Sequence, residues 1–596
     1  MATELIQGYN WKSISKRSLL KVDLKKAFDS LNWSFILLIL KALSFPESLI
    51  NLIEQCITTT WFSVLINDEI GGYFKGSRGL RKGDPLSPYL FVLSMEVLAQ
   101  LLKKNFAEGN IGYHPAADNP EITHLAFADD LMIFFDGQRS SLQQIADTMD
   151  SFASWSGLTM NKDKTELFVA GMSQIETSDL STLGFSLGSL PVRYLGLPLM
   201  HRKLRISDYR PLLDQLKRRF SSWSSRALSF AGRRQLLATV IFGILNFWFS
   251  SFVLPKGCVN EIESLCSRFL WNGNITSRAA AKVSWRVVCL PRKEGGLDLR
   301  DLHTWNKTLS LKLVWLLHSE SQSLWAFWSK RHRLKGTSVW SMDDKKQSAW
   351  IWKSILKLRP LAQRFLRCDV GNGLLVSFWY DYWLPFGPLI QMFGADGPRQ
   401  LGIHIHAKVA DCCTSSGWRL RPARSIQTEQ LQIALCFVPL PSLSTTTDSY
   451  KWYVNDLYLD SFCSRRTWDS VRTRGDVVDW EPVVWFGGHV PRQAFHMWVT
   501  HLDRLPTRSR IATWSDIPDK SCLLCLALHH QKAGISIDPF PHLDLPDGMA
   551  CGERYHLPSN TQAAGCARNN IPSMARAKQP LPQRSLFYAS SDLQGD

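Results

Sequence analysis

Two adjacent aspartates set between two apolar runs are the feature that most constrains what this chain can fold into. Residues 126–135 read AFADDLMIFF, which is an apolar run, an acidic pair and a second apolar run. Aspartate suits turns and aromatic residues suit strands, so the pattern predicts a tight hairpin. Its arms are too apolar to lie in water, and two neighbouring carboxylates there repel each other and lose hydration.

Bound divalent cations would remove that conflict. Asp23 closes another apolar strand, residues 19–22, so two strand ends can present carboxylate oxygens to the same ions. Oxygen ligands of this kind suit Mg²⁺. Short motifs also match by chance, so the residues alone leave two interpretations open, an ordinary hairpin and a metal site.

The bulk composition indicates several domains and a polyanionic partner. The chain has 596 residues, 45% of them hydrophobic, and a formal net charge of +17. Clustered Lys and Arg gain affinity for nucleic acid by releasing counterions, although a ribosomal or membrane-surface protein would share this charge. Thirteen Cys with a single Cys-x-x-Cys pair do not form a secreted disulfide framework, and residues 1–12 lack the apolar core of a signal peptide. We expect an intracellular protein, nuclear or cytoplasmic.

One segment is long and apolar enough to be weighed as a membrane span. Residues 236–254 carry no charge, but they include Thr239, Asn246 and Ser250 and are flanked by basic residues. A buried helix of a soluble domain fits the same pattern, and the rest of the composition favours it. We therefore expect no transmembrane segment.

The first 170 residues predict an α+β layer, an antiparallel sheet backed by helices. A second hairpin is expected at residues 61–75, and a helix with the apolar stripe Leu86, Leu90, Leu93, Val97 and Leu101 follows the loop Gly79 to Pro88. Asp84 can cap that helix with Pro85 at its first position. Arg81 and Lys82 belong either to ordinary helix-start chemistry or to a surface that faces phosphates.

Five motifs in order then carry a resemblance to a known family. They are KVDLKKAFD at residues 21–29, the loop 79–88, FADD at 127–130, residues 157–164 and YLG at 194–196. Their order and spacing resemble the palm of LINE-type, non-LTR retrotransposon reverse transcriptases, most of all the plant members. The resemblance implies a right-hand polymerase that copies an RNA template onto a DNA primer from deoxynucleoside triphosphates.

The resemblance also assigns roles to individual residues. Asp23 and Asp129 match the main ligands of two Mg²⁺ ions, and Asp130 matches their acidic neighbour. The residues matched to nucleotide and template binding are Phe28, Arg81, Lys82, Gly83, Asp84, Pro85 and Lys164. Phe28 matches a bulky residue beside the sugar 2′ position, and a plain core aromatic explains it equally well. Lys82 stands where the family usually has Gln. A lysine lacks the paired donor and acceptor of an amide.

A larger departure lies upstream of the first palm strand. Family members have a finger subdomain there and an endonuclease domain before it, and this sequence has neither. Fingers hold the triphosphate, so we expect a truncated product whose activity the sequence leaves open. Two functions remain, an RNA-directed DNA polymerase fragment and a catalytically inactive nucleic-acid-binding relic.

Five regions are expected along the chain. They are a palm truncated at its N-terminus (1–200), a helical thumb and basic connector (201–340), a Trp-rich connector (341–445), a zinc-binding-like domain (446–530) and a divergent, disordered tail (531–596). In the thumb, Leu212, Leu213, Leu216 and Phe220 share one face, while basic residues lie elsewhere and suit a duplex backbone; these are Lys217, Arg218, Arg219, Arg226, Arg233 and Arg234. The run 330–335 adds further cations.

The C-terminal region resembles the zinc-binding domain that closes these reverse transcriptases. Cys522 and Cys525 are half of a tetrahedral zinc site. The expected second half, a His and a Cys shortly downstream, is not evident; the residues present at other spacings are His529, His530, His542, Cys551, His556 and Cys566. Two ligands alone do not hold the metal, so Zn²⁺ stays a weaker expectation than Mg²⁺.

Overall fold

The computed structural model describes residues 1–511, apart from residues 12, 203, 225–227, 278–280, 344–349 and 506. The chain divides into two compact units, Met1–Leu505 and Pro506–Asp596. The described part of the second unit holds one short helix, α23 (Arg508–Ile511).

A five-stranded sheet is the centre of the N-terminal region. Its strand order is β4-β5-β1-β6-β7, and every neighbouring pair is antiparallel except β6 and β7. The strands are β1 (Arg17–Val22), β4 (His124–Phe127), β5 (Asp130–Phe135), β6 (Glu166–Ala170) and β7 (Ser186–Leu187). The expected mixture of sheet and helices is therefore confirmed, and the acidic pair does lie at a hairpin, between β4 and β5.

Side chains of the sheet alternate between two separate cores, because successive residues of a strand point to opposite faces. Leu20, Val22 and Ile133 pack into the core beneath the helices. Leu19 and Met132 pack on the other face, against residues of the first helix, α1 (Ala2–Leu5). The sheet is thus covered on both faces.

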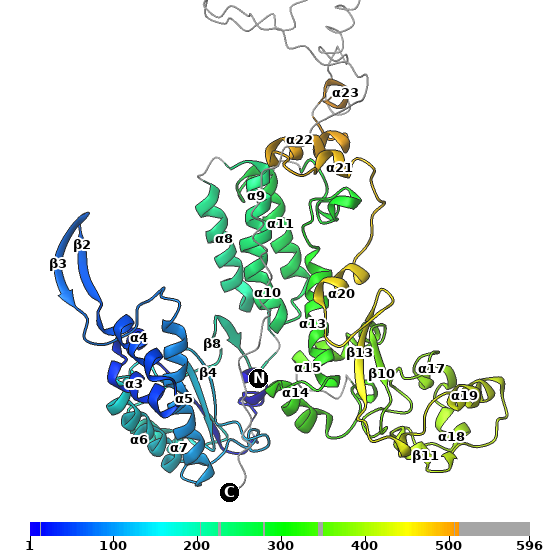
Figure 1. The fold of residues 1–596 in the computed structure, drawn as a ribbon, viewed down its shortest axis with the longest axis horizontal. Helices are drawn as coiled ribbons and strands as arrows, with labels where there is room; N and C mark the ends of the chain where they lie inside the picture. The colour runs from blue at the N-terminus through cyan, green and yellow to red at the C-terminus, as the bar shows by residue number, and fades with distance from the viewer. Residues whose placement is uncertain are drawn as a thin grey trace, which may run out of the picture. The chain divides into compact units, whose positions relative to one another are not determined.

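Helices supply the larger of these two cores (Figure 1). They are α2 (Ala27–Ser30), α3 (Trp33–Ala42), α4 (Glu47–Thr58), α5 (Ser87–Ala107), α6 (Arg139–Ser156) and α7 (Gln174–Ser181). The stripe predicted for α5 is partly wrong, since Leu93, Val97 and Leu101 are only half-buried. Phe91, Leu98 and Leu102 are fully buried instead, because α5 packs against α3 and α6 with an adjacent face.

The second hairpin, β2 (Trp61–Ile66) with β3 (Glu69–Lys75), extends from the end of α4 and away from the sheet (Figure 1). Every one of its residues is exposed, although most are apolar. Trp61 and Tyr73 stack on each other with ring centroids 4.8 Å apart. The predicted hairpin is confirmed, and its apolar surface is left open to solvent.

A helical region follows the short hairpin β8 (Val192–Tyr194) and β9 (Leu197–Leu199). Its elements are η1 (Ile206–Tyr209), α8 (Arg210–Ser224), α9 (Phe230–Leu236), η2 (Leu237–Ile241), α10 (Phe242–Ser251), α11 (Lys256–Asn272), α12 (Trp285–Val288), η3 (Arg292–Glu294) and α13 (Leu302–His318). Leu212, Leu213, Leu216 and Phe220 are all buried, as predicted for one face of α8.

The segment weighed as a membrane span is helical and buries one face in the helical core, while Thr239, Gly243 and Phe247 are exposed. It runs through the end of α9, the π-turn η2 and α10, and Leu237, Leu245 and Phe249 are fully buried in the helical core. Within the described residues, no helix has the length and apolarity needed to cross a membrane.

The same helical core contains residues from far along the chain. The elements that contribute them are α20 (Ser464–Val471), α21 (Glu481–Val484) and α22 (Pro491–His501). Trp468 and Trp498 are buried there, and the Trp498 indole N–H donates to the Gly295 carbonyl at 2.8 Å. The Arg472 guanidinium meets both oxygens of Glu294. Residues 464–501 therefore complete the core of the helices that begin near residue 206.

Between these two parts of the helical core lies a connector. Its first half comprises α14 (Leu324–Ser329), η4 (Lys330–Leu334), η5 (Val339–Ser341), α15 (Trp350–Leu356), α16 (Arg359–Ala362) and β10 (Leu366–Asp369). Its second half comprises α17 (Leu389–Phe393), α18 (Gly397–Leu401), η6 (Ala410–Cys412), β11 (Cys413–Thr414), β12 (Gly417–Trp418), α19 (Ile426–Cys436), η7 (Pro441–Leu443), β13 (Ser449–Val454) and β14 (Leu457–Leu459).

One buried carboxylate organises the loop after β10. The oxygens of Asp448 accept backbone N–H bonds from Gly371, Gly373, Leu375 and Val376, at 2.7 to 3.2 Å. An unpaired buried amide costs free energy, so a single side chain here satisfies four donors that the irregular loop leaves without partners.

Candidate active site

The three acidic residues singled out from the sequence lie at one end of the central sheet. The ladder between β1 and β5 closes with Val22 opposite Leu131, so Asp23 and Asp130 follow at facing positions just beyond it. Asp129 stands in the turn between β4 and β5, where Ala128 has a φ of 52°. Residues more than a hundred positions apart are thus brought to the same sheet edge.

The carboxylates influence one another electrostatically. The pKa of Asp130 is raised by its partial burial and by the charges of Asp129 and Asp23, while Lys21 acts in the opposite direction. Repulsion among carboxylates is the conflict that a cation relieves. No cluster of three or more His, Cys, Asp or Glu within the described residues is arranged to hold an ion, so the three aspartates are neighbours without forming a ready-made metal cage.

Two residues that the sequence analysis gave no role hold Asp23 in place. The side-chain amide of Asn161 donates to Asp23 Oδ2 at 3.2 Å, and its backbone N–H donates to the Asp23 carbonyl at 2.7 Å. The Thr165 hydroxyl accepts the backbone N–H of Asp23 at 3.2 Å. The sequence placed Asn161 inside a matched motif, but only the folded chain shows which carboxylate it contacts.

Tyr194, from the YLG motif, joins this end of the sheet. Burial and then the charge of Asp130 raise the pKa of Tyr194 to about 12. The turn after it is tight, with left-handed φ values of 52° at Leu195 and 78° at Gly196. A neutral phenol is therefore held beside the acidic group at neutral pH.

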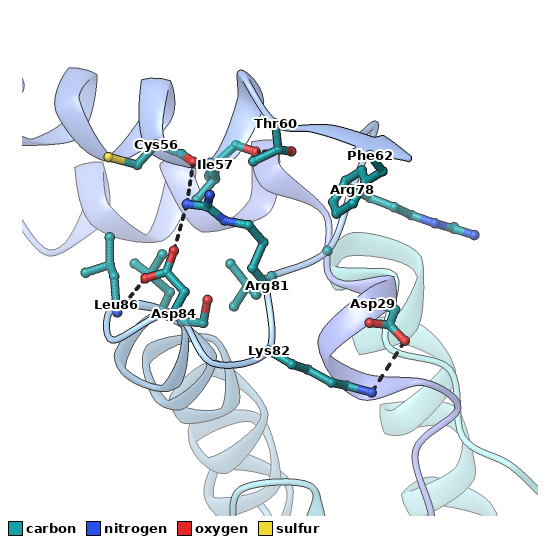
Figure 2. A pocket seen from close by; sticks show the side chains of 14 residues that line it. Asp29, Cys56, Ile57, Thr60, Phe62, Arg78, Arg81, Lys82, Asp84 and Leu86 are labelled. Atoms are coloured by element: carbon teal, nitrogen blue, oxygen red, sulfur yellow. Dashed lines mark hydrogen bonds and ion pairs between the residues drawn. The ribbon is translucent and has the colours of Figure 1, made fainter. Parts of the chain in front are cut away.

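The loop 79–88 borders an open pocket of about 460 Å³ (Figure 2). Arg81 Nη2 donates to Asp84 Oδ2 at 2.7 Å and to the Cys56 carbonyl at 3.2 Å, while Asp84 Oδ1 accepts the Leu86 N–H at 2.9 Å. Asp84 thus ties Arg81 to the turn before α5. Its expected role as the helix cap, with Pro85 at the first position, is wrong, because α5 begins at Ser87 after Leu86 and no side chain caps it. Lys82 is exposed and its Nζ lies 3.8 Å from Asp29 Oδ2. The Lys82 side chain is more exposed than that of Arg81 and its ion pair is longer, so Lys82 is the more available of the two to bind an added anion.

Phe28 lies as both of its interpretations allow. Phe28 is half-buried and stacks on the buried Phe91, with ring centroids 4.7 Å apart and planes 13° apart. Lys164 is exposed at the end of the turn before β6. The stack fixes the Phe28 ring while leaving part of it open.

Several cations expected to face a duplex take part in the protein's own structure instead. Arg233 donates to the Leu270 and Trp271 carbonyls, and Arg234 donates to the Leu297 carbonyl at 3.0 Å. Lys217 pairs with Glu261 at 3.3 Å. The partners lie 37 to 63 positions away, beyond what a helical pattern reveals. Arg218 and Arg219 are exposed as expected, and Arg226 lies outside the described residues.

The basic run 330–335 is also partly internal. Arg333 Nη2 lies 2.6 Å from the buried Glu4 Oε2 and also contacts the Gln7 amide oxygen. Beside it, the Trp328 indole N–H donates to the Ala116 carbonyl at 2.6 Å, and a His332 ring nitrogen contacts the Asn119 carbonyl. These bonds join the connector to the N-terminal sheet region. The interpretation of the whole run as a nucleic-acid surface is therefore wrong for Arg333.

Cys522 and Cys525, the candidate zinc ligands, lie outside the described residues, as do the downstream His and Cys residues named with them.

Comparison with known proteins identifies two regions. Residues 2–199 match the family model described as reverse transcriptase (RNA-dependent DNA polymerase), and residues 462–532 match the model described as zinc-binding in reverse transcriptase. The first match contains Asp23, Asp129 and Asp130, and the second contains Cys522 and Cys525.

Relatives of both plant and animal origin match. A putative ribonuclease H protein of Arabidopsis thaliana is 26% identical over 260 residues, which is 43% of this chain and 42% of that protein. A retrovirus-related Pol polyprotein from the retrotransposable element R2DM of Drosophila melanogaster is 28% identical over 204 residues, 33% of this chain and 18% of that protein. The chain therefore spans less than half the length of these curated relatives.

Among solved structures, an apo telomerase from Candida tropicalis, truncated from its C-terminal domain, aligns with 34% of this chain and 38% of its own. The identity is 13% and the TM-score is 0.25, too low to support an argument about the fold.

Proposed function

Because residues 2–199 form a reverse transcriptase domain of the non-LTR retrotransposon type, we propose that this chain is an RNA-directed DNA polymerase fragment that extends a DNA primer along an RNA template. The observation that carries the proposal is the meeting of Asp23 and Asp130 at facing positions of β1 and β5, with Asp129 in the adjoining turn.

The reaction joins the primer 3′-oxygen to the α-phosphorus of a deoxynucleoside triphosphate. The bond from that phosphorus to the bridging oxygen breaks, pyrophosphate leaves and the hydroxyl proton is released. Asp23, Asp129 and Asp130 would hold two divalent cations, for which Mg²⁺ suits their oxygen ligands. Such ions would lower the pKa of the attacking hydroxyl and stabilise charge on the transferred phosphate and the leaving group.

The protein's own groups orient these reactants. Asn161 fixes the rotamer of Asp23 through the 3.2 Å bond to Oδ2. Phe28, supported from behind by Phe91, limits the space beside the sugar 2′ position. Lys82 and Lys164 are exposed cations that can meet phosphates, while Arg81 and Asp84 keep the loop before α5 in one conformation.

The zinc-binding region would add a second metal. Cys522 and Cys525 supply two thiolates within the matched segment 462–532. Four ligands close a structural zinc site, so two further ligands would have to come from elsewhere in the protein. Metal analysis of the purified full chain, with and without Cys522→Ser, tests whether a zinc ion is bound.

Primer extension tests the main proposal. Purified full chain, an RNA template annealed to a DNA primer, deoxynucleoside triphosphates and either Mg²⁺ or Mn²⁺ should give extended primer. Asp129→Ala should reduce extension by roughly a hundredfold or more, because a ligand of the catalytic ions is lost. Asp163→Ala removes an exposed aspartate of the same domain and should have no such effect. Equal extension by wild type and Asp129→Ala, or none by wild type with either ion, would reject polymerase activity for this chain.

Phe28 gives a second readout within the same assay. Phe28→Ala opens the space beside the sugar, so ribonucleotide incorporation should rise relative to deoxynucleotide incorporation. Phe91→Leu removes the supporting ring and is the matched control for an indirect effect of packing. An unchanged nucleotide preference in Phe28→Ala would leave Phe28 as a core aromatic only.

A further inference from the structure

A second open cavity lies in the connector, outside both matched regions. It has a volume of about 500 Å³ and is formed by the turn after α18, by η6 and by the residue that follows β12. Its apolar lining comes from Ile403, Ala407 and Cys412, which are buried. His404, His406 and Arg419 are exposed on it. The lining therefore combines buried apolar residues with exposed polar side chains that can bind a ligand.

The two imidazoles are held by a rigid turn. The His404 carbonyl accepts the indole N–H of the fully buried Trp379 at 3.0 Å and the Ala407 N–H at 2.9 Å. The His406 N–H donates to His404 Nδ1 at 3.2 Å, which leaves Nε2 of His404 as the ring's donor to an outside group. The two ring centroids lie 5.4 Å apart.

One arginine lines this cavity and a second packs against its Gly402. The Arg419 backbone N–H donates to the Cys412 carbonyl at 2.8 Å, while its side chain is exposed and forms no ion pair within the described residues. Arg421 packs on Gly402, where an added Cβ would lie 2.9 Å from Arg421 Nε, and its Nη1 donates to the Arg399 carbonyl at 2.8 Å. Gly402 lines the cavity, so the Arg421 side chain lies at its edge.

One carboxylate opposes this charge. Asp411 lines the cavity, and its Oδ2 accepts the Lys408 backbone N–H at 2.8 Å. The Lys408 ammonium donates to the Leu375 carbonyl at 2.7 Å and so also lies near this turn. The guanidiniums of Arg419 and Arg421 outnumber this one acid, and the two imidazoles add N–H donors. A metal ion is a poor fit, because the described residues contain no cluster of three metal-ligating side chains.

We propose that this connector cavity binds a nucleotide unit of a single-stranded nucleic acid. Arginine and imidazole N–H groups donate charge-assisted hydrogen bonds to a phosphodiester, and an imidazole face accepts a stacked base. A cavity of about 500 Å³ falls in the range that holds one small ligand. The site contains none of the residues matched to polymerase chemistry, so it binds whether or not the palm extends a primer.

Photo-crosslinking with peptide mapping tests the proposal on the full chain. The Asp129→Ala variant removes turnover, and the probes are a short single-stranded RNA carrying 4-thiouridine, the matching DNA carrying 4-thiothymidine, and inorganic phosphate as competitor. We expect crosslinks within residues 400–421. Their yield should fall about tenfold or more in His404→Ala/Arg419→Ala, because two charge-assisted contacts are lost.

Two matched variants make the result specific. Lys357→Ala removes an exposed cation elsewhere in the connector and should leave the yield within about twofold, since it removes charge without touching the cavity. Asp411→Asn removes the opposing acid and should raise the yield. Arg419→Gln serves as a milder variant if the double variant loses its thermal transition.

The proposal is supported if RNA, DNA or both crosslink to residues 400–421 and the cavity variants lose these crosslinks. A preference for RNA would point to a contact with the 2′-hydroxyl. Absence of crosslinks in residues 400–421 overturns it, as do crosslinks there that the cavity variants do not reduce. Protection of this turn from hydrogen exchange by inorganic phosphate, without any oligonucleotide crosslink, also overturns it. Failure of primer extension has no bearing on any of these results.

Discussion

Asn161 donates its side-chain amide to Asp23 Oδ2 at 3.2 Å, so an uncharged residue of the turn before β6 sets the orientation of the carboxylate at the end of β1. Asp23 and Asn161 are 138 positions apart, and the backbone N–H of Asn161 adds a second bond to the Asp23 carbonyl. The carboxylate is therefore positioned before any cation reaches it.

Asn161→Ala should weaken the use of divalent ions. Residues that orient a metal ligand typically contribute about ten- to a hundredfold to metal affinity or activity. We expect the Mg²⁺ concentration for half-maximal primer extension to rise by about tenfold, with little change in the thermal transition. Electron paramagnetic resonance of bound Mn²⁺ gives the same comparison without turnover. Lys162→Ala is the control, since Lys162 is the exposed neighbour, and equal metal dependence in both variants would exclude the positioning role.

Glu263 should make stability depend on pH. Burial, with a smaller contribution from Asp301, raises the pKa of Glu263 to about 7 from an ordinary value of 4.5, despite the opposing hydrogen bond from the Leu302 N–H. Between these two values the folded chain keeps a proton that the unfolded chain releases. The stabilising contribution is thus complete below about pH 4.5 and is lost as the pH rises through about 7.

Glu263→Gln keeps the acceptor for the Leu302 N–H without the charge. We expect its melting temperature to exceed that of wild type at pH 8 and to match it at pH 5, as followed by circular dichroism. Glu261→Gln is the control, because Glu261 lies in the same helix and pairs with Lys217 near the surface. A gap between Glu263→Gln and wild type that is the same at every pH would contradict the assignment.

Arg333→Ala should destabilise the junction between the connector and the sheet region. It leaves the Glu4 carboxylate, whose side chain is only 3% exposed, without its cation. Breaking a buried pair by removing one partner costs about 3 kcal/mol or more. We expect a lower melting temperature and faster hydrogen exchange in α1 and in residues 114–122. Arg331→Ala, at an exposed neighbouring position, should show neither change. Adding Glu4→Gln to Arg333→Ala should recover part of the loss, and a fully additive double variant would show that the two residues do not interact.

Asp448→Asn should loosen the loop after β10. An amide replaces one acceptor oxygen by a donor group, so it turns an N–H toward backbone N–H groups that also donate. Each lost buried bond costs about 1–3 kcal/mol. Hydrogen exchange of residues 371–376 should accelerate by at least about tenfold. Asp396→Asn, an exposed aspartate of the connector, is the control, and equal protection in both variants would show that Asp448 does not hold the loop.

The sequence predicted the features that short-range patterns encode. The acidic hairpin, the strand that precedes Asp23, the hairpin at residues 61–75 and the buried face of α8 all follow from the periodicity of apolar residues and from turn residues. The resemblance placed the candidate catalytic aspartates on one domain because five motifs occurred in a fixed order.

Contacts between distant residues could not be predicted in this way. Arg234 and Arg333 carry the same charge as solvated surface residues, and only their partners, Leu297 and Glu4, show that they hold the fold together. Trp468 and Trp498 likewise fill the core of helices more than 150 positions earlier, as the Trp498 bond to Gly295 illustrates. A hydrophobic pattern indicates that a side chain is buried, but it does not indicate which element the side chain packs against.

That shared core has a consequence for how the chain responds to a protease. Residues 445–447 are exposed, whereas the segments on either side of them are packed into the protein. A single cut there would leave two polypeptides that stay associated through Trp468, Trp498 and the Arg472–Glu294 pair. They would co-elute as one particle and come apart only in denaturant.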